Sequence, residues 1–505
     1  MIKTVLQYHD HTGYDRHHMS GHGLDWGNQP SVYKSYDGIE PIKLPRDICL
    51  PEERLSLILG ESSTEEAPGV HDMEDISRIL LLTNSLTAKA RHSGGDFYYR
   101  CAASAGALYP TEIYVVPQGI NNIEDGLYHF SISCHGLSLL RKGKLQANII
   151  EAAPSIETKS PALTFFLSAI FFRSAWKYQD RSYRYHLMDT GHVVENMILA
   201  LKSSGLPYTL SYDFDDHEVN RLIGLDETRE VCLYIVSVSG LQDSSEIRTT
   251  EAPDFPDLPD EIRNASRVAS REIDYSAVRE VHEAGSVVIS PSKPGVDMID
   301  RLGVIPREWT KINPPATWPE FRNFSESVLS RRSKRNFVEE PMSCHQLTAI
   351  LEGLCSNTLE TGNSISRHYR AICTGFIIGN AEGFTPAFYL LDKSAKAVGM
   401  VSQGLFTDKM AHICLDQAWL ANAAVHFLFM TNMETLGRKQ GSRGYRYAMM
   451  MAGRMGERLY LMATAMGLGC CGIGAFFDGE AAELLGLNHE SRLLYLVAVG
   501  PIKSG

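Results

Sequence analysis

Part of this chain occurs twice, and the repeat constrains the fold more than any other feature of the sequence. The segment Arg181-Ser182-Tyr183-Arg184-Tyr185 reappears 262 positions later as Arg443-Gly444-Tyr445-Arg446-Tyr447. The same spacing continues without a gap to Gly224-Leu225 and Gly486-Leu487. A period of this length is too long for a solenoid unit and is typical of a duplicated domain. The sequence therefore predicts a pseudo-dimer, in which two copies of one fold are fused in a single chain.

Length and charge exclude several classes of protein. A chain of 505 residues, 44% of them hydrophobic, is expected to form about two to four domains, each with a buried core. The formal net charge is −12 and no long basic run is present, which argues against binding to nucleic acid. The N-terminus lacks the apolar core of a signal peptide, and no apolar run nears about 18 residues, so no membrane association is expected. A cytoplasmic location follows by default.

The cysteines and histidines do not indicate a metal site. The chain has ten scattered cysteines, with Cys470-Cys471 as the close pair and no Cys-x-x-Cys spacing, so reduced and mostly buried thiols are expected. Histidines cluster near the N-terminus, but their spacing fits no standard zinc pattern. These residues are His9, His11, His17, His18 and His22.

The composition divides the chain into four segments. Residues 1–48 are polar without a clear period and are expected to form an arm over a folded body. Residues 49–240 form the first predicted domain and residues 321–505 the second, joined by a linker over 241–320 that is rich in Pro, Asp, Glu and Ser. Helix and strand patterns alternate in both domains, which predicts an α+β fold. Helices are predicted over 73–80, 187–203, 274–283, 345–355 and 445–466, and strands over 112–116, 233–238 and 493–499.

The strongest local signal for chemistry is the basic segment Arg331-Arg332-Ser333-Lys334-Arg335. In an extended chain, Arg331, Ser333 and Arg335 would project from one face. Two guanidinium groups and a hydroxyl suit a phosphate, because each charge-assisted hydrogen bond to its oxygens contributes on the order of 1.5–3 kcal/mol. The alternative interpretation is a solvated basic turn.

A glycine-rich turn follows the long predicted helix of the second domain. It runs Gly467-Leu468-Gly469-Cys470-Cys471-Gly472-Ile473-Gly474-Ala475. Repeated glycines let backbone N–H groups approach a planar ligand closely. Alone, such a turn is more often a helix C-cap.

Together the two segments resemble the flavin-binding motifs of the FMN-dependent nitroreductase superfamily. A third segment, Ser104-Ala105-Gly106-Ala107-Leu108-Tyr109-Pro110, is similar to a signature of the SagB-type dehydrogenases, the branch that includes the azoline oxidases of peptide natural-product pathways. Trp176-Lys177-Tyr178 and Gly126-Leu127-Tyr128-His129 also resemble that branch. Because the similarity spans both domains, two fused nitroreductase-like domains are expected.

The resemblance implies FMN as the cofactor. In the family, the basic segment binds the phosphate and the pyrimidine side of the flavin, the glycine-rich turn presents N–H groups to N5, and the serine-containing loop comes from the other subunit. Arg335 would stabilise the negative charge of the reduced ring, and Lys503 is a weaker phosphate candidate. The expected cofactor-binding residues are Arg331, Ser333, Arg335, Gly472, Ile473, Gly474, Ala475, Ser104, Ala105, Gly106, Leu108 and Lys503.

The resemblance also implies the catalytic residues. The azoline oxidases have a Lys-Tyr pair near the flavin, which matches Lys177 and Tyr178. A lysine desolvated against aromatic surface has a lowered pKa and could act as a base, with Tyr178 relaying the proton. The alternative is a surface lysine beside a packing tyrosine.

The two copies have lost different parts of the site. The repeat puts Gly60, Ser62 and Thr64 where the second domain has Arg331, Ser333 and Arg335, and the neighbouring Glu61, Glu65 and Glu66 make that place unfavourable for a phosphate. Leu210-Ser211-Tyr212-Asp213-Phe214 replaces the second half of the glycine-rich turn, and residues 356–362 provide no counterpart to the Ser104 loop. One complete site between the domains, and therefore one FMN per chain, is expected.

The leading hypothesis is an FMN-dependent oxidoreductase of the SagB type that oxidises a peptide azoline to an azole, with oxygen reoxidising the flavin. A first alternative is reduction of a nitro compound, quinone or enone by NAD(P)H. A second is a catalytically silent scaffold in a peptide-modifying complex. The expected partners are therefore a small-molecule or peptide substrate and NAD(P)H or oxygen, and further homodimerisation stays open.

Overall fold

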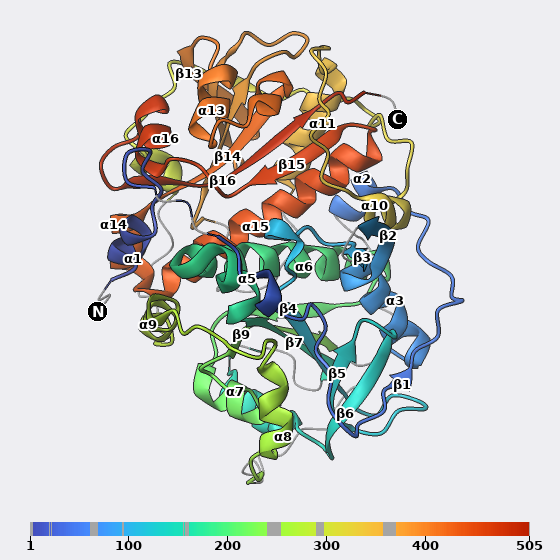
Figure 1. The fold of residues 1–505 in the computed structure, drawn as a ribbon. Helices are drawn as coiled ribbons and strands as arrows, with labels where there is room; N and C mark the ends of the chain where they lie inside the picture. Colours follow the sequence, from blue (N-terminus) through green and yellow to red (C-terminus); the bar gives the residue numbers. More distant parts are fainter. Residues whose placement is uncertain are drawn as a thin grey trace.

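The computed structural model describes residues 4–19, 21, 23–60, 69–92, 95–154, 156, 161–239, 254–288, 297–356 and 370–503. Within these residues the chain forms two similar halves, each built on an antiparallel sheet with helices packed against it (Figure 1). We call residues 49–239 the first half and residues 321–503 the second half; the sheet of the first half also includes Ile42–Lys43 of the arm, and that of the second includes Trp309–Lys311 of the linker. The four segment boundaries proposed from the composition remain a proposal.

Both large sheets of the described chain have seven strands in the same order. In the first half the order is β1 (Ile42–Lys43), β6 (Gly136–Lys142), β5 (Gly126–Ser131), β4 (Thr111–Pro117), β7 (Pro161–Ile170), β9 (Glu230–Ser239) and β8 (Tyr208–Ser211). In the second half it is β10 (Trp309–Lys311), β13 (Ala397–Gln403), β12 (Ala387–Asp392), β11 (Cys373–Ile378), β14 (Val425–Asn432), β16 (Ser491–Gly500) and β15 (Gly469–Ile473). The predicted duplication of an α+β fold is confirmed.

The helices also correspond between the halves. The first half has α2 (Leu55–Leu59), α3 (Met73–Asn84), α4 (Gln146–Ala152), α5 (Phe171–Tyr178), α6 (Ser182–Ser203) and α7 (Asp216–Ile223). The second has α10 (Phe324–Ser330), α11 (Cys344–Cys355), α13 (Thr407–Ile413), α14 (Met433–Gln440), α15 (Arg443–Ala465) and α16 (Asp478–Leu484). Helix α6 begins five residues before the predicted start, because its first turns bury polar side chains such as Arg184, which obscures the apolar period.

Helices α6 and α15 pack against each other between the two sheets (Figure 1). Their backbones touch at two glycines. A Cβ atom on Gly191 would lie 2.3 Å from the carbonyl oxygen of Met450, and one on Gly453 would lie 2.1 Å from that of Met188. Gly191 and Gly453 are partners in the repeat, so the contact is reciprocal, as expected at a pseudo-twofold axis. One apolar core cluster contains residues of both halves, which makes the halves a single body.

The arm and the linker occupy equivalent positions. The arm contains α1 (Val5–His11), and the linker contains α8 (Asp260–Arg263) and α9 (Ser276–Ala284). His9 Nδ1 lies 3.1 Å from the hydroxyl of Tyr445, and His282 Nδ1 lies 3.1 Å from that of Tyr183. Tyr183 and Tyr445 are repeat partners, so α1 and α9 are pseudo-symmetric as well. The helix α1 was missed in a segment predicted to be without a period.

Two helix ends and one hairpin position the candidate site. Helix α10 starts with a capping box of Asn323 and Glu326 and ends at Ser330, so the basic segment leaves it as extended chain. The hairpin of β2 (Leu86–His92) and β3 (Gly95–Arg100) leads directly into the loop that contains Ser104. In the part of the chain that the structure describes, no helix combines the length and the apolar character needed to cross a membrane.

Candidate functional site

The loop 104–109 lies at the junction of the halves and is fastened by Asp189 on α6. The hydroxyl of Ser104 donates to Asp189 Oδ2 at 2.6 Å, and the N–H of Ala105 donates to Asp189 Oδ1 at 3.1 Å. Burial raises the pKa of Asp189 to about 6, although these hydrogen bonds favour its ionised form. Sequence reasoning missed Asp189, because an acidic residue in the middle of a long helix has no distinguishing pattern.

The backbone of this loop is tightly turned. Gly106, Ala107 and Tyr109 have φ angles of 64°, 53° and 48°, which are left-handed conformations that non-glycine residues adopt at a cost. The N–H of Tyr109 donates to Ser104 Oγ at 2.9 Å. The loop is therefore held in a strained conformation by its own hydroxyl and by Asp189.

Gly106 brings the loop against the predicted catalytic pair. A Cβ atom on Gly106 would lie 2.8 Å from the hydroxyl of Tyr178 and 3.1 Å from Lys177 Nζ. Only glycine leaves room for both side chains, which stand at the C-terminal end of α5. Burial lowers the pKa of Lys177, and the charge of Arg335 from the second half lowers it further. The Lys177-Tyr178 pair and Arg335 of the basic segment, which are more than 150 residues apart in the chain, therefore lie near each other.

The basic segment runs beside β15. The N–H of Lys334 donates to the carbonyl oxygen of Cys470 at 2.9 Å, and the N–H of Lys503 donates to that of Asn336 at 3.0 Å. The structure thus brings Lys503 beside the segment. Ser333, Arg335 and Lys503 are exposed. Neither Arg335 nor Lys503 forms an ion pair with a described carboxylate.

Arg331 differs from the other basic residues. It is 3% exposed and donates to the carbonyl oxygen of Cys101, and its Nη2 donates to that of Arg100 at 3.0 Å. Its Nη1 has no hydrogen-bond partner among the described residues. Arg331 Nε also lies 3.8 Å from Glu457 Oε1, and Arg331 therefore ties the second half to the chain just before the Ser104 loop, with Nη1 buried.

Tyr460 on α15 joins the basic segment to the glycine-rich turn. Its hydroxyl lies 2.8 Å from Ser333 Oγ and accepts a hydrogen bond from the N–H of Gly472 at 2.7 Å. The guanidinium of Arg331 lies over its ring, 5.3 Å from the centroid. Sequence reasoning missed Tyr460, which has the pattern of an ordinary core aromatic.

The turn after β15 is held by α6. The carbonyl oxygen of Gly474 accepts from Arg181 Nη2 at 3.0 Å and from the hydroxyl of Tyr185 at 3.2 Å. The N–H groups of Gly474 and Ala475 donate to no residue that the structure describes. Ile473, at the end of β15, is buried and contributes to the core. The turn therefore leaves two backbone donors without a partner among the described residues.

Leu108 lies apart from the other predicted binding residues. Its side chain is 4% exposed and packs with Ile170, Phe172 and Trp176. It supports the base of the loop and of α5.

Asp478 fixes the start of α16 to α6. It accepts from Arg181 Nη1 at 2.8 Å and from Arg184 Nη1 at 2.6 Å. Burial alone would raise the pKa of Asp478, but these charges hold it well below the usual range. The repeat partner Asp216 pairs with Arg443 and Arg446 at 2.9 and 2.6 Å. The repeat pattern, which aligns the two aspartates, was the signal that could have identified this pair of clusters.

The place that the repeat relates to this candidate site is filled by side chains. Tyr212 takes the place of Gly474, is 2% exposed, and accepts a hydrogen bond from Arg454 Nη1 at 2.7 Å. Arg454 takes the place of His192 and pairs with Glu195 at 2.9 Å. The predicted replacements Ser62 and Thr64, the glutamates 61, 65 and 66, and residues 357–362 lie outside the described residues.

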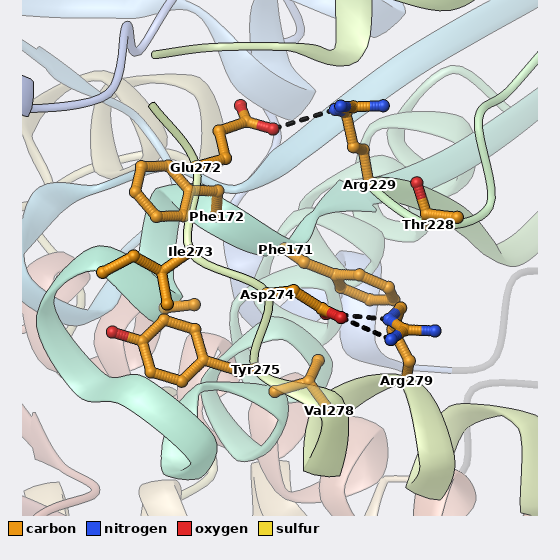
Figure 2. Close-up of a pocket in the computed structure, with 11 residues that line it drawn as sticks. Phe171, Phe172, Thr228, Arg229, Glu272, Ile273, Asp274, Tyr275, Val278 and Arg279 are labelled. Carbon is orange, nitrogen blue, oxygen red and sulfur yellow. Dashed lines mark hydrogen bonds and ion pairs between the residues drawn. The ribbon is translucent and has the colours of Figure 1, made fainter. Parts of the chain in front are cut away.

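A separate cavity of about 270 Å³ lies at the start of α5 (Figure 2). It contains none of the predicted site residues. Its charged side chains are paired, Arg229 with Glu272 at 2.9 Å and Arg279 with Asp274, as the dashed lines show. The charged side chains of this cavity therefore neutralise one another.

The donor set of the junction fits a phosphorylated planar group. The exposed cations Arg335 and Lys503 and the hydroxyl of Ser333 lie along the basic segment. The N–H groups without a described partner lie at the turn after β15, and Lys177 and Tyr178 lie against the Ser104 loop. Among the described residues, no group of three His, Cys, Asp or Glu side chains is placed to hold a metal ion.

Comparison with known proteins gives one family match. A model described as the nitroreductase family matches residues 72–240 and 328–501, which together are more than half of the chain. The crystal structure of a protein from Anabaena variabilis ATCC 29413, which bears the name nitroreductase, is 25% identical and superposes with a TM-score of 0.79, covering 99% of this chain and 100% of that one.

Two curated proteins are similar over shorter stretches. The protein MJ1384 of Methanocaldococcus jannaschii, which bears the name nitroreductase, is 28% identical over 170 residues, 33% of this chain and 86% of that protein. The trifolitoxin-processing protein TfxB of Rhizobium leguminosarum bv. trifolii is 30% identical over 172 residues, 32% of this chain and 46% of that protein.

Proposed function

The chain belongs to the nitroreductase family, and from that premise we propose that it is an FMN-dependent oxidoreductase of the SagB type that oxidises a peptide azoline to an azole. One observation carries the proposal. Gly106 of the SagB-like loop contacts Lys177 and Tyr178, and Arg335 of the other half lies close enough to lower the pKa of that lysine. Three motifs of different chain regions thus converge at one junction.

FMN would bind between the halves. Ser333, Lys503 and Arg331 would hold the phosphate, while Arg335 would face the pyrimidine side of the ring. The backbone of residues 472–475 and of residues 104–106 would line the ring on either side, and Leu108 would support the loop from below. FMN, when bound, supplies a hydride acceptor, and molecular oxygen is the final oxidant in the proposed reaction.

Lys177 would take the proton. Oxidation of an azoline removes a hydride from one ring atom and a proton from its neighbour. The lowered pKa of Lys177 increases the fraction of neutral amine that can accept this proton near pH 7. Tyr178, whose pKa is raised by burial, keeps its hydroxyl proton and can pass a proton between Lys177 and water. Arg335 supplies a fixed positive charge beside the reacting groups.

The peptide substrate class rests on the SagB-like motifs and on a relative. TfxB is a trifolitoxin-processing protein, and its matched region covers about a third of this chain. The nitroreductase names of the other two relatives favour a second candidate, reduction of a nitro compound, quinone or enone by NAD(P)H. The same junction could serve either reaction, so the direction of hydride transfer decides between them.

Anaerobic reduction of the purified, FMN-loaded protein separates the two candidates. A thiazoline-containing peptide is expected to bleach the flavin absorbance and to be converted to the thiazole, whereas NADPH is expected to bleach it only slowly. Rapid bleaching by NADPH with no reaction of the thiazoline would favour the reductase. A protein that binds no FMN would contradict both and leave the silent scaffold.

A further inference from the structure

The N-terminal arm is docked beside the turn 472–475. The N–H of Tyr14 donates to Asp478 Oδ2 at 2.9 Å, and the backbones of Tyr14 and Phe477 form a β-bridge. Arg16 pairs with Glu480 on α16 at 2.9 Å. These contacts hold residues 14–16 against the start of α16, directly after the proposed flavin-facing turn.

The arm thereby adds an aromatic ring to the junction. The guanidinium of Arg181 lies 4.2 Å from the centroid of the Tyr14 ring, and the same guanidinium donates to the carbonyl oxygen of Gly474. Tyr185 donates to that oxygen too, and its ring lies 4.3 Å from the ring of Tyr178. Besides burial, the electrostatic interaction with Tyr14 raises the pKa of both Tyr178 and Tyr185, which indicates that the three phenols are neighbours.

Among the described residues of the linker, the one that corresponds to Tyr14 is not aromatic. Arg181 donates to the carbonyl oxygen of Thr12 in the arm, and its repeat partner Arg443 donates to that of Gly285 in the linker. The same correspondence places Val287 where the arm has Tyr14, and Val287 is 65% exposed. Of these two corresponding positions, the aromatic side chain therefore lies on the side where the catalytic motifs converge.

We infer that Tyr14 is a specificity-determining residue, whose ring packs against a flat, unsaturated ring of the substrate above the turn at Gly474. This inference rests on the proposed function, because it assumes that FMN binds at the junction. The half-buried position of Tyr14, with its backbone fixed by Asp478 and one face covered by Arg181, leaves the rest of the ring for such a contact. The ligand class is a small planar heterocycle or quinone.

Reoxidation by menadione tests the inference without the physiological substrate. The FMN-loaded protein is photoreduced under nitrogen and mixed with menadione in a stopped-flow instrument, and the half-saturating concentration is measured. Tyr14→Ala and Tyr14→Leu are expected to raise this concentration about tenfold, the loss expected for an aromatic contact, with little change in the maximal rate. Tyr14→Phe, which keeps the ring, is expected to have the half-saturating concentration of the wild type.

Two control variants separate the ring from the docking of the arm. Arg16→Ala removes an arm anchor but keeps Tyr14, and Val287→Ala changes the pseudo-equivalent residue. Both are expected to match the wild type. An Arg16→Ala protein as impaired as Tyr14→Ala, or Tyr14→Ala and Tyr14→Leu proteins that bind FMN and saturate like the wild type, would overturn the inference alone. A wild-type protein that takes up no FMN would overturn the proposed function instead.

Discussion

At the scale of single residues, Lys177 and Asp189 carry the proposed chemistry in different ways. Lys177 is placed to react, whereas Asp189 holds the loop that contacts it. Neither role depends on the burial of a large apolar surface. Both depend on a charge whose ionisation has been altered by burial.

Replacing Lys177 by Met is expected to leave FMN binding unchanged and to slow thiazoline oxidation about 100-fold or more, because a positioned base contributes at least this factor. The measurement is the rate of anaerobic flavin bleaching by the peptide. Lys439, the exposed repeat partner of Lys177, provides the matched control, and Lys439→Met should behave as the wild type. A Lys177→Met protein that turns over at full rate would remove the base from the mechanism.

Asp189 should make the stability of the protein depend on pH. Its pKa is about 6 in the fold against 3.8 for an unperturbed aspartate, so between about pH 4 and 6 the folded chain holds a proton that the unfolded chain has released. Stability therefore falls as the pH rises through this window, and the cost above it is about 3 kcal/mol. Asp189→Asn removes the titration.

The free energy of unfolding of Asp189→Asn relative to the wild type should accordingly shift in favour of the variant by about 2.5 kcal/mol from pH 4 to pH 7. Denaturant unfolding of the apoprotein at several pH values gives this difference. Parallel pH profiles for the two proteins would show that the carboxyl group titrates normally.

At the scale of elements, the α6–α15 pair decides how the halves meet. Gly453→Ala would drive a methyl group into the backbone of Met188, so the helices must separate, at a cost of about 3 kcal/mol. A Cβ atom on Gly437 in α14 would have no atom within 4 Å, and Gly437→Ala should be neutral or stabilising by up to about 1 kcal/mol. Unfolding midpoints measure both, and equal midpoints would contradict the close crossing.

The elements themselves were largely predictable from the sequence. The pattern of apolar residues located α3, α11, α15, β4 and β9 within a few residues, because each has its own period. The start of α6 was placed too late and α1 was missed. In both places polar side chains are buried by contacts with distant parts of the chain, and no local pattern records such contacts.

At the scale of the whole molecule, the duplication produces one candidate site and one filled counterpart. Tyr212 and Arg454 stand where the repeat has Gly474 and His192, and the hydrogen bonds that Arg454 donates to Tyr212 and to Glu195 are buried. Binding a ligand there would break the hydrogen bonds of these buried side chains, so we expect no ligand in the counterpart site.

We therefore expect one FMN per chain. Titration of the apoprotein with FMN, followed by flavin fluorescence and protein concentration, gives the stoichiometry. Arg335→Gln should weaken this binding by the loss of a charge-assisted contact worth on the order of 1.5–3 kcal/mol, a shift of about tenfold or more in Kd. Two equivalents of FMN in the wild type would contradict the unequal division of the site.

The sequence by itself determined the duplication, the order of elements, and the motifs that resemble a flavin site, because each is recorded in residues that are close together or that recur at a constant spacing. Only the tertiary structure decided that Arg331 is buried against the first half, that Asp189 and Tyr460 hold the motifs in place, and that Tyr14 reaches the junction. These contacts join residues that are far apart in the chain. Their energies depend on burial and on the precise approach of two surfaces, which no single segment specifies.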